Sequence, residues 1–150
     1  MTKLNVGDKA PQISALDHHG KKFDLSAQQG HKVVIYFYPK DDTPGCTAEA
    51  CNLRDNYSAL LAKGYKVVGV SPDDLKSHVK FADKFELPFP LMPDPEKTII
   101  NAYGVWGPKK FMGKSYEGVL RTTFIIDEKG NIEKIIDKVE TKNHAEQITG

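Results

Sequence analysis

The sequence predicts an α/β sandwich built on a mixed β-sheet. Short apolar runs alternate along the chain with segments that carry helix-start signals, which is typical of strands covered by helices. The last two predicted strands flank a polar turn, so the sheet should close with an antiparallel hairpin. The chain contains no internal repeat and no low-complexity linker, and we therefore expect one domain over residues 1–150.

The N-terminal part of the chain predicts a hairpin, a buried strand and a helix. Residues 17–20, Asp-His-His-Gly, form a turn sequence between two short strands, which gives both histidines a plain turn role. The apolar run of residues 33–38 predicts a buried strand. Pro44 and Gly45 interrupt the strand pattern, and a helix is expected from about Cys46 to Lys63.

The C-terminal part continues the alternation. Residues 66–71 predict another strand, and Ser71-Pro-Asp-Asp74 predicts a helix with Ser71 as N-cap, ending near Phe85 before the prolines of residues 87–90. The remaining expected elements are a helix from the start signal at residues 94–97 to Tyr103, strands at 122–127 and 132–138 around the turn 128–131, and a short helix from about Asn143.

Composition excludes several classes of function. With 150 residues, of which 39% are hydrophobic, the chain can form a core without disulfides or metal. The net charge is +1, from 21 basic and 20 acidic side chains, so we expect neither a nucleic-acid nor a membrane partner. No apolar run approaches the roughly 18 residues of a membrane-spanning helix. Nothing at the N-terminus resembles a signal peptide, and the expected location is the cytoplasm.

Both cysteines, Cys46 and Cys51, follow the strand predicted at residues 33–38. Cys46 falls in the first turn of the predicted helix, where unpaired backbone N–H groups and the helix dipole favour a thiolate over a thiol. Because the thiolate is the reactive form, this position indicates chemistry. The alternative is a cysteine that is simply a small buried hydrophobe.

Other uses of two cysteines fit less well. A structural disulfide is not expected in a reducing compartment, and a zinc site needs about four ligands, whereas the five histidines are scattered. On an intact helix, the Cα atoms of Cys46 and Cys51 would be roughly 8–9 Å apart, and a disulfide needs about 4.4–6.8 Å. If the two cysteines pair, the first one or two turns of the helix must unwind.

Four residues carry a family resemblance. Pro39-x-x-x-Thr43-x-x-Cys46 is similar to the active-site signature of the peroxiredoxins, and Arg121, beside the apolar run that follows it, resembles the distant arginine of those sites. The continuation to Cys51 resembles the bacterioferritin comigratory protein, or Q-type, branch, in which a resolving cysteine lies five residues on. The likeness spans nearly the whole chain, from Gly7 to His144.

The resemblance implies a thioredoxin-like three-layer sandwich with a mixed central sheet and an N-terminal β extension. It also implies a thiol peroxidase that reduces hydrogen peroxide and organic hydroperoxides. Cys46 would be the peroxidatic nucleophile that becomes a sulfenic acid, and Cys51 would resolve it as an intramolecular disulfide. Thioredoxin or a similar dithiol would recycle the enzyme. No metal, haem or flavin cofactor is implied, and the branch favours a monomer.

The resemblance also assigns roles around the nucleophile. Thr43 would hydrogen-bond the thiolate or the peroxide oxygen, Arg121 would stabilise negative charge on sulfur and on the breaking O–O bond, and Pro39 would shield the pocket from water. Each has a structural alternative. Thr43 is also a plausible helix N-cap, Pro39 an ordinary strand end, and Arg121 a partner for any surface carboxylate.

Three further residues and two further functions stay open. Glu49 is either a capping or dipole partner of the helix or a residue near the site, and Trp106 and Phe111 either line the pocket mouth or pack in a loop. A thioredoxin-type disulfide oxidoreductase would require a Cys-x-x-Cys motif, which this chain lacks. A non-catalytic thioredoxin-like binding module would have no need of the threonine, cysteine and arginine together.

Overall fold

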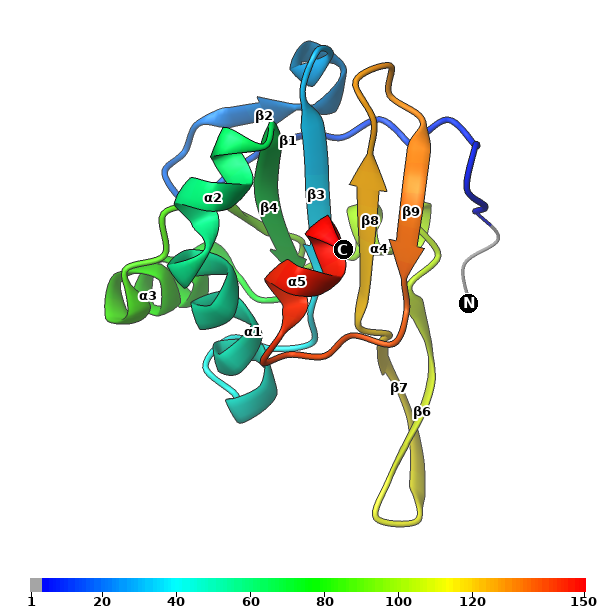
Figure 1. Cartoon of the computed structure of the whole chain (residues 1–150). Helices are drawn as coiled ribbons and strands as arrows, with labels where there is room; N and C mark the ends of the chain where they lie inside the picture. Colours follow the sequence, from blue (N-terminus) through cyan, green and yellow to red (C-terminus); the bar gives the residue numbers. More distant parts are fainter. Residues whose placement is uncertain (1–3) are drawn as a thin grey trace.

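A central five-stranded sheet organises the structure, a computed structural model that describes residues 4–150. Its strand order is β5-β4-β3-β8-β9, with β3 parallel to β4 and antiparallel to β8 (Figure 1), so the predicted mixed sheet is confirmed. The strands are β3 (Lys32–Phe37), β4 (Tyr65–Ser71), β5 (Leu91–Pro93), β8 (Thr122–Ile126) and β9 (Ile132–Ile136).

The central strand β3 divides the interior into two cores. Val33, Ile35 and Phe37 belong to one apolar cluster, and Val34 and Tyr36 belong to the other, because successive side chains of a strand point to opposite faces. The second core is covered by α1 (Pro44–Asp55), α2 (Tyr57–Ala62), α3 (Leu75–Phe85) and α5 (His144–Thr149). The first is covered by α4 (Thr98–Ala102) and the N-terminal segment, which gives three layers (Figure 1).

The N-terminal extension is the predicted hairpin. Strands β1 (Ser14–Leu16) and β2 (Lys22–Asp24) are antiparallel, and the Asp17 carboxylate accepts hydrogen bonds from turn N–H groups. A short 3-10 helix, η1 (Leu25–Gln28), follows. His18 does more than occupy the turn, because it is buried and its Nδ1 accepts the N–H of Leu91 at 3.0 Å. It therefore joins the extension to the edge of the central sheet.

The helix expected over residues 46–63 is two helices that meet at Asn56. The Asn56 side chain donates to the carbonyl of Asn52 at 2.8 Å, and its backbone has left the helical region, with φ −108° and ψ 6°. Asparagine competes for backbone groups in this way, which is why it interrupts helices. The first of the two helices begins at Pro44, not at Cys46.

Two predicted helix starts were wrong in position. Asp74, not Ser71, caps α3 and accepts the N–H of Ser77 at 2.9 Å, because Ser71 is still paired as the last residue of β4. Residues 94–97 form a turn, in which Lys97 N–H donates to the Asp94 carbonyl, and α4 begins only after it.

The sequence did not predict the hairpin formed by β6 (Trp106–Phe111) and β7 (Lys114–Val119). Its strands carry glycines, a proline and several lysines, so they lack the apolar alternation that marks a half-buried strand. Met112 and Gly113, both with positive φ, form its tip, which projects from the body of the molecule (Figure 1). None of the helices formed by residues 4–150 is long and apolar enough to cross a membrane.

The close packing of β4 at Gly69 generates a prediction on stability. A Cβ at this position would lie 2.8 Å from Leu91 Cδ2 and 2.9 Å from the Tyr36 ring. Gly69→Ala should therefore lower the free energy of unfolding by about 1–3 kcal/mol, measured by urea denaturation. In the control Gly118→Ala, the new Cβ meets the flexible Lys109 side chain at 3.3 Å. Equal losses in the two variants would contradict this packing argument.

Candidate active site

Cys46 is buried in the first turn of α1, as the sequence predicts. Thr43 is the N-cap, with extended φ and ψ of −98° and 156°, and Pro44 occupies the first helical position. The first helical hydrogen bond runs from Thr47 N–H to the Thr43 carbonyl, so the N–H groups of Gly45 and Cys46 have no helical acceptor. The Cys46 side chain, only 1% exposed, therefore lies at the positive end of the helix.

Arg121 contacts Cys46 although the two residues are 75 positions apart in the sequence. It lies directly before β8, and its Nη2 donates to Cys46 Sγ at 3.2 Å while its Nη1 donates to Glu49 Oε1 at 2.7 Å. Cys46 and Glu49 face the same partner because residues three apart share one side of a helix. The guanidinium fork thus holds a thiol and a carboxylate together.

Gly45 makes this approach possible. A Cβ at position 45 would lie 3.3 Å from Arg121 Nη2, a distance tighter than most side chains tolerate. The glycine before Cys46 therefore leaves room for the guanidinium group beside the helix start.

Glu49 is the least solvated member of the site. Its side chain is fully buried, and burial raises its pKa to about 7 against the opposing effect of Arg121. Its Oε2 lies 3.5 Å from His144 Nε2, at the start of α5. Glu49 therefore shares the guanidinium group of Arg121 with Cys46. The sequence did not single out His144, since a lone histidine in a short terminal helix carries no motif.

The other residues expected in the site lie near the start of α1. The Thr43 hydroxyl donates to the Lys40 carbonyl at 2.9 Å, so it does not donate to Cys46. Pro39 is half-buried one residue after the buried Tyr38. Cys51 is half-buried further along α1 and, like Cys46, is a free thiol. The helix between the two cysteines is intact, as the spacing argument requires.

Trp106 and Phe111 lie in the β6–β7 hairpin, not in a loop. Trp106 is half-buried against the core, with Lys97 Nζ 4.8 Å from its ring centroid. Phe111 is 66% exposed near the tip of the hairpin. Neither residue lines the cleft beside Arg121.

A cleft of about 610 Å³ opens beside Arg121. Lys109 and Lys138 supply positive charge to its wall, and apolar side chains make up much of the rest, including Val105, Leu120 and Ile135. Burial lowers the pKa of Lys109, and the charge of Arg121 lowers it further, whereas Cys46 raises it. The cleft is therefore partly apolar, and its wall carries two lysines and the carboxylate of Asp137.

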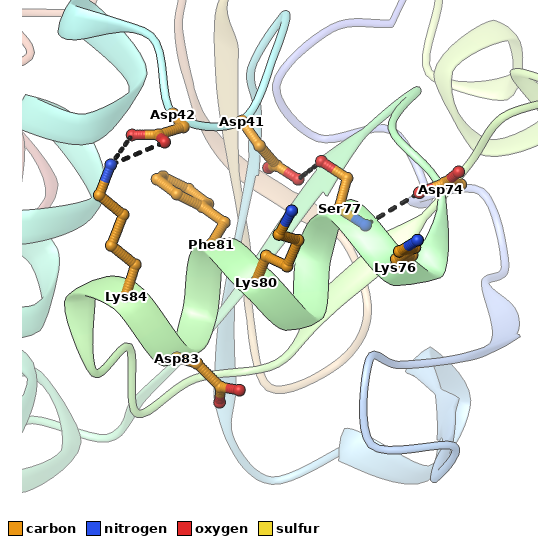
Figure 2. A pocket seen from close by; sticks show the side chains of 9 residues that line it. All are labelled: Asp41, Asp42, Asp74, Lys76, Ser77, Lys80, Phe81, Asp83 and Lys84. Atoms are coloured by element: carbon orange, nitrogen blue, oxygen red, sulfur yellow. Dashed lines mark hydrogen bonds and ion pairs between the residues drawn. The ribbon is translucent and has the colours of Figure 1, made fainter.

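The segment between β3 and α1 is fixed to α3 through Asp41. The Asp41 carboxylate accepts from Tyr38 Oη at 2.6 Å, from Ser77 Oγ at 2.7 Å and from His78 Nδ1 at 2.7 Å. Burial opposes the charge of Asp41, but these hydrogen bonds outweigh it and lower its pKa. Figure 2 shows Asp41 and Ser77 beside a cleft of about 830 Å³, which the ion pair of Asp42 and Lys84 borders.

Asp41, Asp73 and His78 bring ligand-type atoms within 4.8 Å of one another. The Asp73 carboxylate already accepts from Asp41 N–H at 2.8 Å and from Ser71 Oγ at 2.7 Å, and His78 Nδ1 donates to Asp41. The group therefore serves as a hydrogen-bonded anchor for the start of α1.

The other end of α1 is tied to the C-terminal segment through Asn52. Its Nδ2 donates to the Lys142 carbonyl at 2.9 Å, and its Oδ1 accepts the N–H of Ala145 at 2.8 Å. Helix α1 is therefore held at both ends by polar contacts, with the two cysteines between them.

Comparison with known proteins gives concordant matches. Residues 6–135 match the AhpC/TSA family. The chain is 46% identical over 148 residues to a putative peroxiredoxin bcp of Haemophilus influenzae (99% of this chain, 96% of the relative) and 43% identical to peroxiredoxin Bcp of Escherichia coli K12 (99% and 95%). A solved structure of the Xanthomonas campestris bacterioferritin comigratory protein, described for its alkyl peroxide reduction activity, matches with a TM-score of 0.84 and 34% identity (91% and 87%).

The contact of Arg121 with Cys46 generates a prediction on thiol reactivity. Arg121→Ala removes the cation beside the sulfur, so alkylation of Cys46 by iodoacetamide should require higher pH. Arg121→Lys keeps a charge but loses the fork that holds both Cys46 and Glu49, so it should restore the alkylation profile only in part. Mass spectrometry of a pH series resolves the two cysteines.

Arg54→Lys is the matched control, since Arg54 donates to the Phe85 carbonyl instead of Cys46. Its alkylation profile should equal that of the wild type. Unchanged profiles in both Arg121 variants would place this guanidinium outside the site.

Proposed function

The chain belongs to the AhpC/TSA family, as a peroxiredoxin of the bacterioferritin comigratory protein branch, and on that premise we propose which of its residues perform the reaction. It is a thiol peroxidase with a thioredoxin-like fold, which reduces hydroperoxides at the expense of a thiol reductant. The observation that carries the proposal is the 3.2 Å hydrogen bond from Arg121 Nη2 to Cys46 Sγ, because it selects Cys46 as the thiol that is stabilised as an anion.

In the first step, the Cys46 thiolate attacks one oxygen of the hydroperoxide. The S–O bond forms as the O–O bond breaks, sulfur is oxidised to sulfenic acid, and the leaving oxygen takes a proton to give water or an alcohol. Arg121 stabilises the charge that develops along the breaking bond. The free N–H of Cys46 is a second donor, and the Thr43 hydroxyl becomes a third if it turns from the Lys40 carbonyl. Pro39 limits the access of water.

The cleft beside Arg121 supports substrates larger than hydrogen peroxide. Its apolar wall suits the alkyl part of an organic hydroperoxide, while the guanidinium group at one end suits the peroxide oxygens. The alkyl peroxide activity described for the Xanthomonas campestris relative is consistent with this assignment. We therefore propose both hydrogen peroxide and organic hydroperoxides as substrates.

In the second step, Cys51 attacks the sulfenic sulfur of Cys46. The S–S bond forms and the hydroxyl leaves as water, so the chain stores the oxidation as an intramolecular disulfide. The intact α1 holds the two residues too far apart, roughly 8–9 Å between Cα atoms, so the turns around them must unwind. Asp41 anchors the segment before α1 to α3, and this anchor limits the unwinding to residues after it.

The reductant and the setting follow from this chemistry. A disulfide in an unwound and exposed segment is accessible to a protein dithiol, and thioredoxin is the proposed reductant. The disulfide joins two residues of one chain, so the cycle needs no second subunit and the proposed state is a monomer. Recycling by a dithiol requires a reducing compartment, which supports the cytoplasm as the location.

The assignment of the two cysteines makes opposite predictions for two variants. Cys46→Ser should abolish peroxide reduction, because a hydroxyl supplies no anionic nucleophile near neutral pH. Cys51→Ser should react once and stop as a sulfenic acid, which dimedone traps and mass spectrometry detects on Cys46. The two variants control for each other, since each keeps one thiol. A dimedone adduct on Cys51 of an active Cys46→Ser variant would reverse the roles.

Unwinding makes a separate prediction for the oxidised wild type. Amide hydrogen exchange should rise over residues 44–55 on disulfide formation, while strands β3 and β8 stay protected. Exchange should also rise at Ala145, whose N–H depends on the Asn52 side chain of α1. Peroxide-treated Cys51→Ser, which cannot form the disulfide, should keep low exchange. Equal exchange in reduced and oxidised protein, with a proven Cys46–Cys51 bond, would exclude this unwinding.

A further inference from the structure

The contact between Glu49 and His144 has no role in the steps above. Both side chains are fully buried, and Glu49 Oε2 lies 3.5 Å from His144 Nε2. Within residues 4–150, this carboxylate oxygen has no hydrogen-bond partner, whereas the other oxygen is bound to Arg121. A buried charged oxygen without a partner is costly, so the state of the pair needs an explanation.

The hydrogen bonds around His144 show which of its ring nitrogens carries a hydrogen. The Gln147 side chain is oriented by two backbone groups: its Nε2 donates to the Lys138 carbonyl and its Oε1 accepts the N–H of Glu140, both at 2.9 Å. His144 Nδ1 lies 2.8 Å from that same Oε1, so Nδ1 carries a hydrogen and donates. In the neutral imidazole, Nε2 then has only a lone pair, and the Thr123 hydroxyl lies 2.7 Å from it.

The Thr123 hydroxyl donates to this lone pair, so a neutral His144 has no hydrogen to offer Glu49, and an ionised Glu49 would keep Oε2 as a buried anionic oxygen without a donor. One added proton removes this cost, either as a carboxylic acid on Glu49 or as an imidazolium on His144. We propose that Glu49 and His144 share one proton in the resting enzyme, and that His144 is thereby a positioning residue that leaves the charge of Arg121 to Cys46. This rests on the proposed role of Cys46 as nucleophile.

The charges around the pair explain why the proton matters. With the proton bound, the Cys46 thiolate and the Arg121 guanidinium balance each other. Without it, Glu49 becomes a second anion on the same guanidinium group, and less of the positive charge is available to the sulfur and the leaving oxygen. The reaction of Cys46 with peroxide should therefore slow when the pair loses its proton.

The groups that face the pair from the surrounding elements are few. They are Cys46 on α1, Arg121 before β8 and Tyr36 on β3, with Lys109 on β6 beyond Arg121 and Cys46. Tyr36 stays neutral, because burial first and Glu49 next raise its pKa far above its ordinary value. Burial raises the pKa of Glu49 to about 7 and lowers that of His144. A buried acid with a raised pKa is protonated below that value and loses its proton as pH rises through it.

The test is the pH dependence of the single-turnover reaction of Cys46 with hydrogen peroxide, measured by competition with horseradish peroxidase. The wild-type rate constant should fall by about three- to tenfold on the alkaline side of neutrality, as the pair loses its proton. In Glu49→Gln, which stays neutral and still accepts from Arg121, this alkaline fall should vanish. In His144→Gln, which can donate to an ionised Glu49, it should move to lower pH.

The control is His31→Gln, an exposed histidine outside the site, which should keep the wild-type profile. A Glu49→Gln variant with an unchanged alkaline fall would overturn the proposal. Carboxyl ¹³C NMR of wild-type protein labelled at glutamate tests the same proton without any variant. One glutamate carboxyl signal should change near neutrality instead of at the usual value of about 4.3, either because Glu49 itself loses the proton or because its neighbour His144 does, and the absence of any such change would also overturn the proposal.

Failure of the proposed function gives a different result. A protein whose reaction with peroxide does not depend on Cys46 would show no loss in Cys46→Ser at any pH. The activity of Cys46→Ser thus tests the proposed function, whereas the glutamate titration tests the shared proton without measuring activity. The two proposals can therefore fail separately.

Discussion

One half-buried cation, the guanidinium group of Arg121, organises the candidate active site. It donates to Cys46 Sγ and to the fully buried carboxylate of Glu49, and both partners belong to the first turns of α1. Burying an acid is costly unless a cation is close, so the position of Glu49 depends on Arg121. In the proposed mechanism, the same guanidinium group stabilises the charge on the reacting sulfur. On that proposal, one side chain contributes both to the stability of the helix start and to the reactivity of the thiol.

The fold separates helix α1, which carries both cysteines, from the strands β3 and β8, which form the rigid base beneath it. Strands β3 and β8 carry their side chains into both cores and position the start of α1 and Arg121. Helix α1 packs on this sheet through Ala50 and Leu53, but its ends are held by polar contacts of Asp41 and Asn52. Polar contacts can exchange with water when a segment opens, whereas the apolar strands cannot. The architecture thus favours a change confined to α1.

Much of this arrangement could be predicted from the sequence. The apolar run before Pro44 and the helix signals behind it placed Cys46 correctly, because buried strands and helix starts have local signatures. Arg121 required the family resemblance, since no local rule joins residues 75 positions apart. The break at Asn56 and the cap at Asp74 depend on competition between side chains and backbone, and the β6–β7 hairpin lacks an apolar pattern. The burial of Glu49 against His144 arises only from the tertiary fold.

Gly45 limits how this enzyme can be adapted to heat. Replacing a helical glycine with alanine is a common route to stabilisation, by about 0.4–1 kcal/mol where the backbone allows it. At this position the added methyl group would press on Arg121 Nη2 from 3.3 Å. The substitution that would strengthen the helix would therefore push by a few tenths of an ångström on the guanidinium group that is hydrogen-bonded to Cys46. Stabilising substitutions are therefore better placed away from the first turn of α1. At position 45, the lower helix stability that comes with glycine accompanies the close approach of Arg121.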